Sequence, residues 1–277
     1  MPNRKPKIIG GICEFCGVPA YTCDHYRGRV DSQGVILKDI TPIENKIIAE
    51  VGPPPVILDR PGFTKNCKKL ADIIIPHHTN NRDLAILLEN IDLSIFNVIV
   101  CAGQSFGVNC NKGARLAETD KLIFINDDVE LKNWQLIKIL NNIGPYDFIS
   151  STQIAGLQKI NKYWGIGLFT KGDKIIHSIS FEEKYSLFPS GFFFGIKRKH
   201  WEKLGGFNEQ FRTGNEDVDF GLRALKLKLK TRIFDLEIRH KECQSKGRFD
   251  YINQNEELIY SLWSQAKLRS VFNKFYL

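Results

Sequence analysis

Long apolar runs and a recognisable leader are missing from this chain of 277 residues. No stretch reaches the roughly 18 consecutive apolar residues that a membrane-spanning helix needs. The amino terminus, MPNRKPKIIGG, lacks the apolar segment of a secretion signal. Both absences argue against a membrane-spanning or secreted protein, so we expect a cytoplasmic one and leave open a peripheral position at a membrane surface.

Internal repeats and low-complexity tracts are also lacking, so neither a repeat architecture nor a disordered chain is expected. The seven cysteines are an odd number in a chain too long to depend on cross-links, which argues against a disulfide scaffold. Apolar residues make up 43% of the sequence, enough for a substantial core. The totals therefore predict one large globular domain with a smaller accessory piece.

Four potential metal ligands do cluster near the amino terminus, in CEFCGVPAYTCDH: Cys13, Cys16, Cys23 and His25. A CxxC pair followed by a CxH pair can supply the four ligands of tetrahedral zinc, and Cys67 is a possible substitute ligand. Four protein ligands leave no open coordination position, so this zinc would be structural. Free thiols or a redox pair remain alternatives.

Basic residues outnumber acidic ones, and the formal net charge is +8 at pH 7. Such a balance favours acidic partners: phosphate-bearing ligands, an anionic membrane surface or nucleic acid. The total alone does not choose among them, and many basic proteins have no such partner.

The chain divides into three segments. Residues 1–68 hold the Cys/His cluster and a linker, GPPPVILDRPG, whose prolines prevent helix formation. Residues 69–250 form the main domain. Residues 251–277 are expected to form a helix packed on that domain.

Apolar runs alternate with amphipathic segments in the main domain. Residues 73–75 precede Pro76 and a helix from about Arg82, and NVIVCAGQSFGVNCNKGARLA repeats this order. The next run, KLIFINDDV, is apolar enough to be a strand buried on both faces. This alternation predicts an α/β fold with a single, mostly parallel sheet flanked by helices.

The third strand ends at two adjacent acids, Asp127 and Asp128. Ligands of open α/β sheets bind beyond the carboxyl ends of the strands, and a divalent cation would relieve the repulsion between neighbouring carboxylates. A strand-ending turn or a helix N-cap is the simpler alternative.

Three acids also open GNEDVDFGLRALKLKLKT, whose apolar residues recur at helical spacing from Val218 onward. Glu216 and Asp217 therefore lie at a helix amino terminus, where the helix dipole alone favours negative charge. The following segment, TRIFDLEIRHKE, alternates as a strand does and presents His240 near its end.

In chain order, IIIPHHTNNRDLAILL, NCNKGARLA, LIFINDDVEL, SGFFFGIKRKHWEKLGGFNEQF, NEDVDFGLRALKLK and RHKECQS resemble the motifs of glycosyltransferase family 2. They span about residues 71 to 245. The resemblance implies an inverting, nucleotide-sugar-dependent hexosyltransferase with the GT-A fold, whose catalytic domain is the 69–250 segment. Its partners would be a nucleotide-sugar donor and a saccharide or other hydroxyl acceptor.

The resemblance also implies roles for individual residues. Asp128, in the place of the family's DxD motif, would ligate Mn²⁺ or Mg²⁺ on the donor diphosphate, and His240 would complete the metal site. Asp217 would be the general base that deprotonates the acceptor, with Glu216 holding the acceptor or acting in its place. The donor side would comprise Pro76, His77, Asn80, Asn111, Gly113, Asn126 and Asp127.

On the acceptor side the resemblance places Ser190, Gly191, Phe192 and Trp164, with Tyr163 a further candidate. Core packing is an equally good interpretation of Phe192, and a strand-end histidine with no metal is an alternative for His240.

One departure from the family pattern affects the donor. The acidic, serine-rich segment that contacts the nucleobase is absent, and Gly103, Gln104 and Ser105 are the nearest candidates. The nucleotide therefore stays undecided. Two other functions remain open: a transferase acting on nucleic acid, and a non-catalytic binding protein on a transferase fold.

Overall fold

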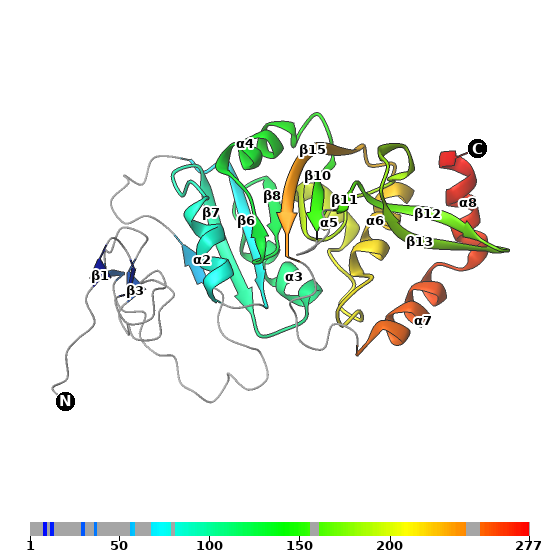
Figure 1. Cartoon of the computed structure of the whole chain (residues 1–277), viewed down its shortest axis with the longest axis horizontal. Coiled ribbons are helices and arrows are strands. Elements are labelled where there is room, and N and C mark those ends of the chain that lie inside the picture. Colours follow the sequence, from blue (N-terminus) through cyan, green and yellow to red (C-terminus); the bar gives the residue numbers. More distant parts are fainter. Residues whose placement is uncertain are drawn as a thin grey trace.

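The computed structural model describes residues 68–78, 81–155, 161–241 and 250–276, together with the backbone of five short strands within residues 1–58 (Figure 1). Four of these strands form two isolated pairs: β1 (Ile8–Ile9) with β2 (Ile12–Cys13), and β3 (Arg29–Val30) with β4 (Ile36–Leu37). Of the predicted zinc ligands, only Cys13 falls in a described element, and only its backbone is described. Cys16, Cys23, His25 and Cys67, like Asn80 of the predicted donor site, lie outside the described residues.

The central feature is a nine-stranded mixed sheet with the order β5-β7-β6-β8-β14-β10-β15-β9, and β11 pairs with β10 off this path. The strands span Val56–Leu58 (β5), Ala71–His77 (β6), Phe96–Ala102 (β7), Lys121–Ile125 (β8), Val129–Glu130 (β9), Phe148–Ala155 (β10), Asn161–Tyr163 (β11), Phe193–Lys197 (β14) and Thr231–His240 (β15).

The prediction of a mostly parallel sheet is wrong. Strands β7, β6 and β8 are mutually parallel, as are β10 and β15, but β14 runs antiparallel to both β8 and β10. The edge strands β5 and β9 are antiparallel to their neighbours as well. A buried apolar run has the same composition in either direction, so the sequence pattern did not distinguish these strands from parallel ones.

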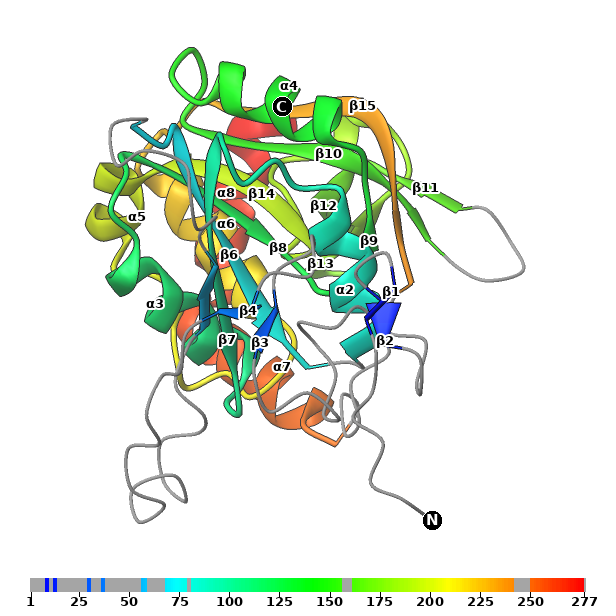
Figure 2. The same ribbon diagram turned by 90° about the vertical axis from the view of Figure 1, so that its left-hand side faces the viewer.

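Helices cover both faces of the sheet. Helices α2 (Asn81–Glu89) and α4 (Asn133–Asn142) pack on one face, and α3 (Phe106–Leu116), α5 (Arg198–Leu204) and α6 (Glu216–Lys226) pack on the other (Figure 2). Strand β8 shows why: Leu122 and Phe124 belong to the core under α3, α5 and α6, whereas Ile123 and Ile125 belong to the opposite core. The prediction that this strand is buried on both faces is confirmed.

The sheet includes a strand from before residue 68. Strand β5, from the proline-rich stretch assigned to a linker, pairs with β7 through Val56↔Val100 and Leu58↔Val98. Prolines exclude helix but tolerate an edge strand, where one side makes no ladder bonds. The sheet therefore begins before the segment predicted as the main domain.

The carboxyl-terminal segment forms two helices instead of the single one expected, α7 (Ile252–Leu262) and α8 (Gln265–Tyr276). Both lie at one end of the molecule beside the hairpin of β12 (Gly165–Lys171) and β13 (Lys174–Ser180) (Figure 1). Trp263, between the helices, donates its indole N–H to Asp219 of α6 at 2.9 Å. The Gln265 side chain bonds both backbone groups of Ile175 in β13. Because the helix is interrupted at Trp263, the carboxyl-terminal segment contacts both α6 and the β12–β13 hairpin.

No helix in the described part of the chain is long and apolar enough to cross a membrane.

Candidate functional site

The carboxyl ends of β6 and β8 lie side by side at the centre of the sheet. The chain leaves β6 through α2 toward β7 on one side, and it leaves β8 toward β9 and β10 on the other. Adjacent strands whose connections diverge leave a crevice at their carboxyl ends, where ligands of open α/β sheets bind. Residues 76–78 and 126–128 occupy this position.

Asp127 is turned toward β6. Its Oδ2 lies 2.5 Å from Nδ1 of His77 and accepts the backbone N–H of His78 at 2.8 Å. The carboxylate is buried, and its hydrogen bond raises the pKa of His77 above 6.5, an effect that burial of the ring opposes. Asp127 therefore ties the end of β8 to the end of β6.

Asp128 is turned the other way, toward β15. Strand β9 pairs with β15 in the register His240↔Val129, which brings His240 beside the residue that precedes Val129. Nε2 of His240 lies 3.0 Å from Oδ1 of Asp128, and both residues are buried. The adjacent carboxylates thus avoid direct repulsion because each faces a different histidine.

The His240 ring is held by two further neighbours. The Asn126 side-chain nitrogen lies 3.3 Å from its Nε2, and the Phe192 ring stacks on it at a centroid distance of 5.3 Å and an angle of 22°. Nδ1 of His240 has no hydrogen-bond partner within the described structure. Phe192 is itself buried and packs against His240, while its predicted contact with an acceptor stays a prediction.

The acidic start of α6 reaches the same region through a turn. Oδ2 of Asp217 accepts the backbone N–H of Gly191 at 2.8 Å, and the carbonyl of Phe192 accepts the backbone N–H of Asn126 at 2.9 Å. A side chain at position 191 would crowd Asp217, with a Cβ only 3.3 Å from the aspartate Cβ. The 191–192 turn therefore connects the acids after β8 with the acids of α6.

Asp217 contributes to helix capping, because its Oδ1 accepts the backbone N–H of Val218 in the first turn of α6 at 2.9 Å. The residue before the helix, Asn215, is the N-cap and adopts a left-handed conformation with φ of 68°. Asp219 has a separate structural role, since it pairs with Arg223 at 2.8 Å and accepts the Trp263 indole N–H. The first turn thus contains one acid used for packing, a buried acid at Glu216, and Asp217 facing the 191–192 turn.

Two of the predicted donor residues have packing roles. The Asn111 amide bonds the backbone N–H and carbonyl of Phe207, each at 2.9 Å, and also Glu209. A Cβ at Gly113 would lie 2.4 Å from Cγ2 of Ile74, so this glycine lets α3 pack closely on β6. These contacts give Asn111 and Gly113 a packing role, and their predicted donor role stays a prediction. Pro76 is buried in β6, directly before His77.

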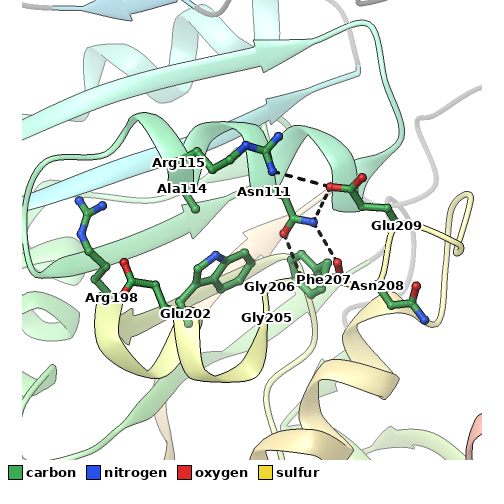
Figure 3. A pocket seen from close by; sticks show the side chains of 11 residues that line it. Asn111, Ala114, Arg115, Arg198, Glu202, Gly205, Gly206, Phe207, Asn208 and Glu209 are labelled. Atoms are coloured by element: carbon green, nitrogen blue, oxygen red, sulfur yellow. Dashed lines mark hydrogen bonds and ion pairs between the residues drawn. The ribbon is translucent and has the colours of Figure 1, made fainter.

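Beside α3 lies a cavity of about 660 Å³ whose floor is the turn held by Asn111 (Figure 3). Arg115 points toward Glu209 across it, with their nearest side-chain atoms 3.9 Å apart. The cavity lies between α3 and α5, not at the carboxyl ends of the strands. Its lining includes none of the acids and histidines of the crevice or of the start of α6: His77, Asp127, Asp128, Glu216, Asp217 and His240.

The remaining acceptor candidates lie along β10, β11 and the hairpin. Ser190 is 3.5 Å from Gln153, which pairs with Tyr163 in the sheet. The Tyr163 ring meets Phe181 at 5.2 Å, and Lys162 lies 5.5 Å above the ring of Trp164.

Sequence reasoning missed His177. Burial lowers the pKa of this histidine, while the charges of Asp217 and Glu256 raise it, so the residue lies near the predicted base. Its strand, KIIHSIS, carries no motif, and only the packing of the hairpin against the core could reveal this placement.

Asp128 and His240 would offer a divalent cation one carboxylate oxygen and one imidazole nitrogen. An octahedral ion with bonds of about 2.1 Å separates adjacent ligands by about 3.0 Å, because the octahedron edge is √2 times the bond length. The Asp128–His240 separation is 3.0 Å. No group of three His, Cys, Asp or Glu residues among the described ones is arranged to hold a metal. Mg²⁺-type sites in nucleotide enzymes commonly have one or two protein ligands and take the others from phosphates and water.

His77 gives the site a pH dependence. Its native pKa is raised above 6.5, so the His77–Asp127 interaction stabilises the fold fully below pH 6.5 and progressively less as pH rises through the native pKa. We expect His77→Asn to lower the free energy of unfolding by about 1.5–3 kcal/mol in the acidic range, as for hydrogen bonds to charged groups. Urea denaturation across pH should show this difference shrinking at alkaline pH. A difference that grows with pH would contradict it.

The fold and the site define an α/β protein with paired carboxylates and histidines at the switch point of its sheet. Comparisons of the sequence with models of known protein families and with curated proteins find no match.

Proposed function

We propose that this protein is a metal-dependent inverting glycosyltransferase of the GT-A type, which moves a sugar from a nucleoside diphosphate to an acceptor hydroxyl. The observation that carries the proposal is the pairing of Asp128 with His240 at 3.0 Å, connected through the 191–192 turn to Asp217. This arrangement supplies a place for a cation and a separate carboxylate for the acceptor, which are the two groups such a transfer needs. The motif resemblance points to the same three residues.

In this proposal, Asp128 and His240 hold Mn²⁺ or Mg²⁺, which when bound offsets the negative charge of the departing diphosphate. The acceptor oxygen forms a bond to the anomeric carbon, and the bond from that carbon to the phosphate oxygen breaks, so the diphosphate leaves with the electron pair. Attack from the opposite face inverts the anomeric centre.

Asp217 takes the proton of the acceptor hydroxyl. The hydroxyl becomes acidic only as the new bond forms, so the position of the carboxylate matters more than its basicity. The Gly191 N–H fixes one of its oxygens at 2.8 Å, which limits rotation of the group. Asp127, held by His77 and the backbone of His78, keeps the ends of β6 and β8 together beneath the donor.

A binding screen tests the proposal directly. Thermal unfolding of the full chain is followed with UDP, dTDP, GDP and their sugars, each with Mn²⁺ and with EDTA. At least one nucleoside diphosphate should raise the unfolding temperature in Mn²⁺ but not in EDTA, because a ligand that binds only the folded state stabilises it. Slow Mn²⁺-dependent hydrolysis of the matching nucleotide sugar should accompany binding. Absence of any metal-dependent ligand in this set would reject the proposal.

A further inference from the structure

Cations and aromatic rings gather on a surface formed by α4 and the first half of β15. These two elements lie along the upper rim of the molecule in both views (Figures 1 and 2). The members of this basic-aromatic face are Trp134, Lys138, Tyr146, Lys230, Arg232 and Phe234. At about 3.3 Å per residue, Arg232 is roughly 25 Å along β15 from His240, so the face is separate from the candidate site.

The face is continuous. Lys138 lies over the Phe234 ring at 5.5 Å, and Arg232 lies over the same ring at 5.9 Å. Lys230 lies over the Tyr146 ring at 5.0 Å, and the rings of Tyr146 and Phe234 meet edge to face at 6.1 Å. Three cations are thus held in a row by two aromatic side chains.

A large apolar group is exposed beside these cations. Trp134, one helical turn before Lys138, is 56% exposed, and its indole contacts no other described aromatic ring. Burying an exposed tryptophan is favourable, so this side chain is available to an apolar partner.

Two of the three cations of the face, Lys138 and Lys230, are in no ion pair with the described residues. Glu183 pairs with Arg232 at 3.2 Å, and Asp147 accepts the backbone N–H of Lys230. Among the described residues, no carboxylate lies within ion-pair distance of the ammonium groups of Lys138 or Lys230. Part of the net charge of +8 is therefore concentrated here.

From this combination we infer that the basic-aromatic face docks the protein on an anionic membrane surface. Lys138, Lys230 and Arg232 attract lipid phosphates, while Trp134 enters the boundary between headgroups and acyl chains. Tryptophan flanked by lysine and arginine is the composition that membrane interfaces favour. Nucleic acid fits less well, because the rings of Tyr146 and Phe234 are already covered by cations and cannot stack on bases.

Vesicle binding tests the inference without reference to catalysis. The full chain is sedimented with vesicles of phosphatidylcholine alone and with vesicles that also contain phosphatidylglycerol. We expect binding to the anionic vesicles only, weakened at least tenfold in Lys138→Glu/Lys230→Glu and severalfold in Trp134→Ala. Tryptophan emission should shift to shorter wavelength with anionic vesicles in the wild type and shift less in Trp134→Phe.

Lys171→Glu/Lys174→Glu is the matched control, since it makes the same charge change on the β12–β13 hairpin, away from this face. Thermal unfolding confirms that each variant is folded. If the control variant loses as much vesicle binding, net charge alone explains the effect and the inference is wrong. So would binding to neutral vesicles, no vesicle binding at all, or binding of single-stranded RNA or duplex DNA to this face in the absence of vesicle binding.

Discussion

Replacing Asp217 with asparagine should lower the rate of sugar transfer by about 10²–10⁴-fold, the usual contribution of a general base. Asparagine has nearly the shape of aspartate and can still accept the Gly191 N–H through its carbonyl. Its amide nitrogen cannot accept the Val218 N–H, so the substitution removes one main-chain hydrogen bond as well as the ability to accept a proton from the acceptor. Transfer is measured by product formation at saturating donor, and donor affinity by thermal shift with Mn²⁺.

Donor affinity should stay within about twofold of wild type in Asp217→Asn, because the general base acts on the acceptor. Asp173→Asn, at the exposed tip of the β12–β13 hairpin, controls for the loss of one negative charge. If Asp217→Asn transfers sugar at the wild-type rate and Glu216→Gln does not, the base is Glu216. If both retain full activity, the assignment of α6 to the acceptor is wrong.

Replacing Asp128 with alanine should remove both metal-dependent donor binding and transfer. Asp128 is the carboxylate that faces His240 at 3.0 Å, and a cation without it retains one predicted protein ligand. A bound cation supplies several kcal/mol of charge stabilisation, so we expect transfer to fall by at least about 100-fold. The unfolding temperature with nucleoside diphosphate should be the same in Mn²⁺ and in EDTA.

Asp120→Ala is the matched control for this substitution, because Asp120 is exposed at the opposite end of β8. It should retain the metal-dependent shift. Manganese-dependent stabilisation that survives in Asp128→Ala would show that the cation binds elsewhere and would remove the central argument for a metal-dependent transferase.

The elements with strong periodicity could be predicted from the sequence. Strand β8 and helix α6 form where the sequence predicted them. A strand buried on both faces gives a continuous apolar run, and a helix buried on one face gives apolar residues at helical spacing. The antiparallel insertion of β14 between β8 and β10 could not be predicted, since strand direction is decided by tertiary connections. The break at Trp263, whose indole donates a hydrogen bond to a distant helix, was also not predicted.

The candidate site could also be predicted only in part. The sequence indicated that Asp128 follows a strand and that His240 lies near the end of another. The pairing of β9 with β15 brings the two residues together. It gave no indication that Asp127 would be committed to His77, or that Asn111 would hold the 205–209 turn. A motif specifies residue types at a spacing, and it does not say which partner each side chain will find.

The 191–192 turn holds Asp217 and Asn126 through main-chain atoms alone. A substitution at position 192 can therefore change the packing around His240 without breaking either hydrogen bond. Any displacement of this peptide segment, in contrast, must shift both acidic loops at once. The loop after β8 and the start of α6 should therefore move together.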